Sequence, residues 1–185
     1  MKILQKADLS EVLKSFDQSH IVTDGTNEWA REMLVCADEK FHGQWHKVRL
    51  DKKDVVNTLL VYHQDPEVEG VGIPLIPRQG ATVRQVIARW PKVKNEYKEK
   101  NNACFEKIIR FGKAEFSPIF LSTKPLTGYD QQVYEKLEYH DESLVHLDGT
   151  HRLIAWTLAG RFNFFKYYFS NKKLEVFVAG ELEKS

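Results

Sequence analysis

The chain has 185 residues, of which 42% are hydrophobic and 12% aromatic, and its formal net charge at pH 7 is +1. This length and composition are typical of one globular domain with a substantial core, and they exclude a disordered chain. The small net charge disfavours nucleic acid as a partner, and the lack of a signal peptide or a membrane-length apolar run predicts a soluble cytoplasmic protein without membrane contact.

Helical periodicity dominates the first 70 residues. Apolar positions at helical spacing predict three helices, and an aromatic, basic stretch between the second and the third predicts a short strand. The helices span residues 8–16, 27–40 and 51–63, and the strand lies within 41–50. Because three amphipathic helices need a surface to bury against, we expect residues 1–70 to form a helical extension packed on a core of residues 71–185.

The rest of the sequence mixes strand and helix patterns. Strands are predicted over residues 71–76, 117–121, 144–147, 163–169 and 174–179. Helices are predicted from Thr82 to Pro91, from Asn101 or Asn102 to Gly112, at Asp130–Leu137, and after Thr150. This order predicts an α+β fold, namely a small mixed β-sheet with surrounding helices.

The turn Asp148-Gly149-Thr150 joins the third of these strands, residues 144–147, to the last helix. Gly149 permits a sharp reversal, and the Thr150 hydroxyl is placed to cap the helix. The start of that helix combines free backbone N–H groups with the cation of Arg152 and the neighbouring His151. This combination suits an anion, most naturally a phosphate.

The residues DGTHRLIA at 148–155 resemble the DG-x-HR-xx-A signature of the ParB/sulfiredoxin-like superfamily, nearest to its free-serine-kinase-like branch. Members of this superfamily hold nucleotide phosphates in a strand–turn–helix. The resemblance implies a ParB/sulfiredoxin-like nucleotide-binding core that takes ATP or ADP, or another nucleotide, together with Mg²⁺. The residues implied to bind phosphate are Gly149, Thr150, His151 and Arg152. Asp148 would bind Mg²⁺ or orient the acceptor hydroxyl, and Asp148 and His151 are the implied catalytic residues.

The sequence departs from this pattern at two positions. Gln79 stands where the serine-kinase branch carries a glutamate base, and an amide cannot accept a proton. Thr150 stands where sulfiredoxins carry their reactive cysteine, which disfavours sulfinic-acid reduction. If Asp148 only shapes the turn, Asp141 and Glu142 are the next candidates for the base.

Arg78, before the first core helix, and Arg84, within it, are candidate substrate-binding residues, because an arginine fork matches a carboxylate or phosphate. Among the other histidines and cysteines, only His42 and His46 have a metal-like spacing, and no third ligand accompanies them. Cys104 lies in an apolar helix pattern and is interpreted as a core residue.

These features predict a nucleotide-dependent phosphotransferase, kinase-like and dependent on ATP or ADP, that acts on a small hydroxyl-bearing metabolite. Two alternatives stay open. One is a nucleotide-binding regulatory module without turnover, which the missing glutamate favours. The other is a ParB-like nuclease, which the low net charge disfavours. The expected partners are a nucleotide and a small-molecule substrate, and the oligomeric state is open.

Overall fold

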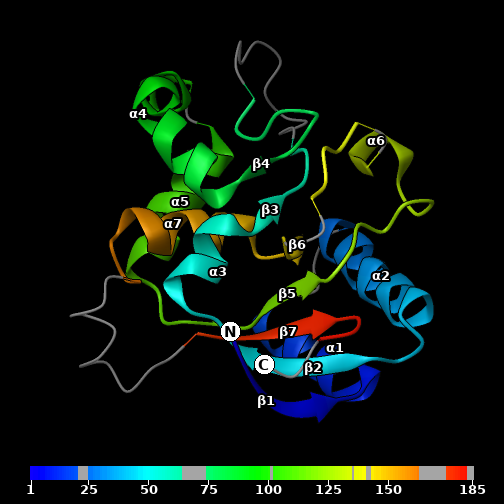
Figure 1. Cartoon of the computed structure of the whole chain (residues 1–185). Coiled ribbons are helices and arrows are strands. Elements are labelled where there is room, and N and C mark those ends of the chain that lie inside the picture. Colours follow the sequence, from blue (N-terminus) through cyan, green and yellow to red (C-terminus); the bar gives the residue numbers. More distant parts are fainter. Residues whose placement is uncertain are drawn as a thin grey trace.

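A mixed β-sheet forms the centre of the computed structural model, which describes residues 1–20, 25–63, 74–100, 102–134, 136–140, 143–162 and 174–182. The described strands form one seven-stranded sheet in the order β1-β2-β7-β5-β6-β3-β4 (Figure 1). Their bounds are β1 Lys2–Ala7, β2 Trp45–Arg49, β3 Leu59–Leu60, β4 Ala81–Thr82, β5 Ile119–Ser122, β6 Val145–Asp148 and β7 Glu175–Ala179. The β5–β7 and β3–β6 pairs are parallel and the others are antiparallel. The structure agrees with the predicted α+β class, while a ParB/sulfiredoxin-like fold stays a prediction.

Helices cover both faces of this sheet (Figure 1). Their bounds are α1 Leu9–Ser19, α2 Gly25–Lys40, α3 Lys52–Asn57, α4 Val83–Glu99, α5 Ala103–Lys113, α6 Gln131–Tyr134 and α7 Thr150–Leu158. Successive strand side chains enter opposite cores, as their alternation requires. In β7, Val176 and Val178 pack with α3, α4, α5 and α7, whereas Phe177 and Ala179 pack with α1 and α2.

Two predicted helix ends are wrong. The helix after Asp51 ends at Asn57 rather than continuing to His63, because Leu59 and Leu60 pair with neighbouring strands. The helix that begins after Thr82 does not end at Pro91 but continues to Glu99. Pro91 is exposed, while the following turns bury Val93 and Tyr97. Burial of this apolar face offsets the hydrogen bond that a proline removes from a helix.

The first part of the chain is not a purely helical extension. Strands β1, β2 and β3 lie before residue 70 and belong to the same sheet as the later strands. β1 was not predicted, and β3 lies between β6 and β4. The predicted strand 163–169 and most of the predicted strand 71–76 lie outside the described residues, although Ile76 forms a bridge with His63. Among the described helices, none has the length and apolar character needed to cross a membrane.

Candidate functional site

The predicted strand–turn–helix is present as β6, Gly149 and α7. Gly149 has a φ of +105°, and a Cβ atom there would lie 3.0 Å from Cγ1 of Ile119. Gly149, not Thr150, is the N-cap of α7, so the predicted Thr150 cap is wrong. The hydroxyl of Thr150 instead lies 2.8 Å from Nε2 of His146, and both side chains are buried.

Asp148 and Arg152 form a buried ion pair behind this turn. The Arg152 guanidinium donates to the Asp148 carboxylate and, at 2.9 Å, to the Ser117 hydroxyl, and Arg152 is only 5% exposed. Nε2 of His20, at the end of α1, lies 3.3 Å from the same carboxylate. Burial acts to raise the pKa of Asp148, but Arg152 and His20 outweigh it and hold that pKa well below its usual range. The charge of Arg152 is therefore already neutralised within the protein.

The burial of His146 predicts that acid weakens the fold. Burial lowers the pKa of His146 from 6.5 to about 4. Between these values the unfolded chain binds a proton that the folded protein does not, so the free energy of unfolding decreases as the pH falls from 6.5 to 4. The decrease from this histidine is roughly 3 kcal/mol and is measurable by urea denaturation at the two pH values.

A non-titrating variant provides the control for this prediction. His146→Gln keeps a polar group beside Thr150 but binds no proton, so its stability should fall less over the same pH range. An equal loss of stability in the variant and the natural chain would contradict the assignment to His146.

Three potential metal ligands meet beside the start of α7. His63 follows β3, Cys104 is the second residue of α5, and His151 is the second residue of α7; their ligand atoms all lie within 4.8 Å of one another. Sγ of Cys104 is 3.4 Å from Nε2 of His63, and the rings of His63 and His151 meet edge to face with centroids 4.8 Å apart. Donors on one tetrahedral zinc ion lie about 3.3–3.7 Å apart, so small side-chain movements would complete such a site.

The surroundings of the cluster favour metal binding. Nε2 of His151 is buried and has no hydrogen-bond partner among the described residues. Burial, together with His63 and Lys107, lowers the pKa of His151 well below 6.5, which keeps it in the neutral form that binds metals. Cys104 lies at the positive end of α5, where its N–H donates to the Asn102 side chain at 2.7 Å, and this end favours a negative sulfur.

The predicted site residues lie at several separate places in the structure. His151 belongs to the metal-ligand cluster, whereas Asp148 and Arg152 form the ion pair. Arg78 lies over the ring of Tyr62, with 5.3 Å from Cζ to the centroid, and Arg84 donates to Asn57 at 3.5 Å. The structure therefore does not bring Arg78 or Arg84 together with the turn Asp148-Gly149-Thr150. Asp141 and Glu142 lie outside the described residues.

The sequence analysis missed His63 and Cys104 as functional candidates. It assigned Cys104 to the core, and Cys104 is indeed buried, but its sulfur contacts His63. The residues come from three separate elements, so no local spacing identifies them. The only available signal was that a histidine or cysteine lies within three residues of one end of each element.

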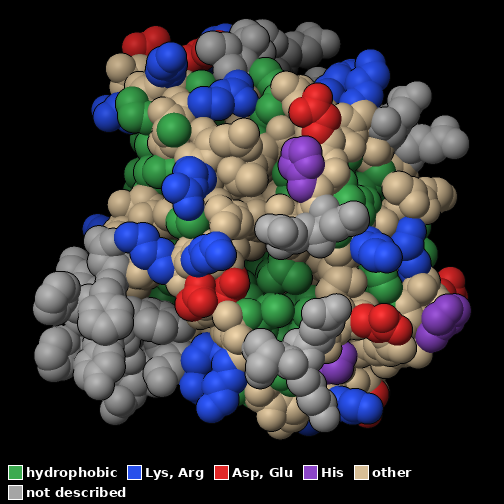
Figure 2. Space-filling model, in the orientation of Figure 1, with side chains coloured by type: hydrophobic (Ala, Val, Ile, Leu, Met, Phe, Trp, Pro, Cys, Tyr) green, Lys and Arg blue, Asp and Glu red, His purple; other side chains and the backbone are tan. Residues whose placement is uncertain are grey.

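The surface gives no sign of a nucleic-acid site on the face shown in Figure 2. Lys and Arg side chains are scattered over this face and interspersed with Asp and Glu, rather than gathered in one basic patch. This distribution agrees with the net charge of +1.

Comparisons with known proteins give one match. No curated protein and no solved structure matches the chain. The resemblance to the ParB/sulfiredoxin-like superfamily therefore stays a prediction. The family of unknown function DUF6309 matches residues 1–185. Since this match covers the whole sequence, the chain belongs to the family DUF6309.

Proposed function

We propose that this protein is a zinc-dependent enzyme of hydrolytic type, with Zn²⁺ bound by His63, Cys104 and His151. The observation that supports the proposal is the convergence of three ligand atoms, one from each residue, within 4.8 Å. One of these residues, His151, also has a buried Nε2 without a hydrogen bond among the described residues. Nitrogen and sulfur donors suit Zn²⁺, whereas Mg²⁺ prefers oxygen ligands.

Among the residues that the structure describes, three potential ligands converge, and this number supports a catalytic rather than a structural role. Structural zinc sites are closed by four protein ligands, while catalytic sites use three and leave a position for water. Zinc lowers the pKa of a bound water to about 7, which generates a hydroxide nucleophile at neutral pH. Zinc held by His63, Cys104 and His151 would supply this hydroxide for attack on a carbonyl carbon or phosphorus of a substrate. The bond from that atom to the leaving group would break, and the leaving group would take up a proton from water.

The nucleotide-dependent phosphotransferase remains a separate prediction, and the geometry supports it less well. A phosphate at the start of α7 would compete with Asp148 for a guanidinium that is 5% exposed. Arg152 and His20 both contact Oδ2 of Asp148, so Mg²⁺ at that oxygen would compete with both cations. Incubation with ATP or ADP, Mg²⁺ and candidate acceptors tests this alternative through product formation.

Cobalt substitution tests the zinc proposal. The metal-free chain should bind one equivalent of Co²⁺ and give a thiolate-to-metal charge-transfer band together with the strong visible bands of four-coordinate cobalt. Azide should alter the visible bands by occupying the open position. The zinc form should hydrolyse 4-nitrophenyl acetate faster than the metal-free form. A cobalt spectrum that azide leaves unchanged, without metal-dependent hydrolysis, would overturn the catalytic assignment.

A further inference from the structure

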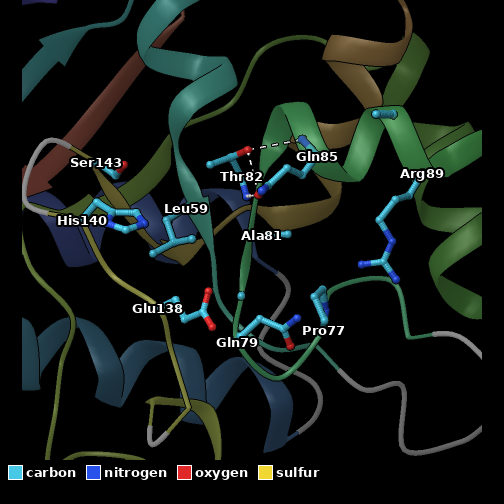
Figure 3. A pocket seen from close by; sticks show the side chains of 12 residues that line it. Leu59, Pro77, Gln79, Ala81, Thr82, Gln85, Arg89, Glu138, His140 and Ser143 are labelled. Atoms are coloured by element: carbon cyan, nitrogen blue, oxygen red, sulfur yellow. Dashed lines mark hydrogen bonds between the residues drawn. The ribbon is translucent and has the colours of Figure 1, made fainter.

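A second candidate site lies at the edge of the sheet, away from the metal-ligand cluster. It is a pocket of about 440 Å³ between β4, α4 and the segment that precedes β6 (Figure 3). Ser143, before the start of β6, lines it, whereas His151 of the cluster follows the end of β6. The volume falls within the range of small-molecule sites in proteins.

The wall of the pocket that contains Glu138 is held in place by specific contacts. The N–H of Glu138 donates to the carbonyl of Gln79 at 3.0 Å, and the Tyr139 hydroxyl donates to the carbonyl of Thr123 at 2.6 Å. Leu137 packs over Gly80, where a Cβ atom would lie 2.5 Å from Cδ1 of Leu137. Leu137 and Tyr139 face the core, so the alternate residues of this segment face the pocket.

Charges of opposite sign face the pocket from its two sides. Arg89 projects from α4, and Glu138 lies across from it, with Gln79 between them (Figure 3). The structure gives neither Arg89 nor Glu138 an ion pair or a side-chain hydrogen bond with any described residue. Thr82, Gln85, His140 and Ser143 add further polar groups to the lining, while Leu59 adds apolar surface.

We propose that this pocket binds a small zwitterionic metabolite, whose anionic group pairs with Arg89 and whose cationic group pairs with Glu138. An arginine fork offers paired donors to a carboxylate or phosphate. A carboxylate on the opposite wall accepts from an ammonium or guanidinium group. A singly charged ligand would form an ion pair with only one of Arg89 and Glu138, so both ligand charges are needed for full affinity.

Titration of the full chain with small charged probes, followed by protein NMR, tests this proposal. The probes are glycine, 4-aminobutyrate and 6-aminohexanoate, which separate the two charges by increasing lengths; hexanoate and hexylamine are the singly charged controls. At least one zwitterion should shift the backbone amide NMR signals of Gly80 and Gln85 in a saturable way. It should bind at least about tenfold more tightly than either control.

Variants locate the binding on the two walls. Arg89→Gln and Glu138→Gln should each weaken the best probe at least about tenfold. Lys92→Gln, on the same helix but outside the pocket, should leave its affinity unchanged. The proposal is overturned if no zwitterion gives saturable shifts, if hexanoate or hexylamine binds equally well, or if Lys92→Gln weakens binding as much as Arg89→Gln. None of these outcomes depends on metal, so they are independent of the zinc proposal.

Discussion

Cys104→Ser should weaken Zn²⁺ binding by at least about 100-fold, a larger loss than for a supporting residue of a metal site. A serine hydroxyl is a poor zinc ligand at neutral pH, and its shorter side chain also lies farther from the two imidazoles. Competition with a chromophoric zinc chelator measures the affinity. In the cobalt form, the variant should lose the thiolate charge-transfer band altogether.

The second cysteine provides the matched control. Cys36 lies on α2, on the other side of the sheet, and is partly exposed. Cys36→Ser should therefore keep both the affinity and the cobalt band. Because Cys104 is buried, its variant also requires a melting curve, and His63→Gln supplies a second ligand variant at a more exposed position. Unchanged zinc affinity in both folded ligand variants would show that the three residues do not form the site.

The local elements were largely predictable because the signals that define them are local. The caps at Asp8, Asp51 and Thr82 each accept from the first turn of the following helix. The buried strand that contains Val145 and Leu147, and the glycine turn after it, were also evident in the sequence. Such features depend on a few neighbouring residues, so a single chain reveals them.

The candidate site was harder to predict because it depends on tertiary pairing. His63, after β3, approaches His151, after β6, because these two strands pair in parallel, and the two-residue strand β3 has no detectable alternation. The sequence also could not show that Asp148 and Arg152, four residues apart, would turn toward each other. On a helix this spacing is compatible with an ion pair as well as with two groups that hold a ligand.

Arg152→Met should destabilise the fold by about 3 kcal/mol, because it leaves the largely buried carboxylate of Asp148 without its cation. Ser117 would lose its hydrogen bond as well. For a chain of this size, such a loss lowers the melting temperature by roughly 6–12 °C, which calorimetry or circular dichroism measures directly. Methionine fills much of the space of the arginine stem, so the effect reports mainly on the missing charge.

Two comparisons distinguish this structural role from phosphate binding. Arg31→Met removes an arginine from the ion pair with Asp17, whose side chains are each 42% exposed, and should cost no more than about 1 kcal/mol. Arg152→Met/Asp148→Leu removes both charges and should recover part of the lost stability, since no unpaired carboxylate remains. If Arg152→Met instead has the melting temperature of the natural chain and loses affinity for ATP, Arg152 binds phosphate, and its ion pair with Asp148 does not stabilise the fold. A destabilised variant whose stability the double replacement restores would establish Arg152 as a structural residue.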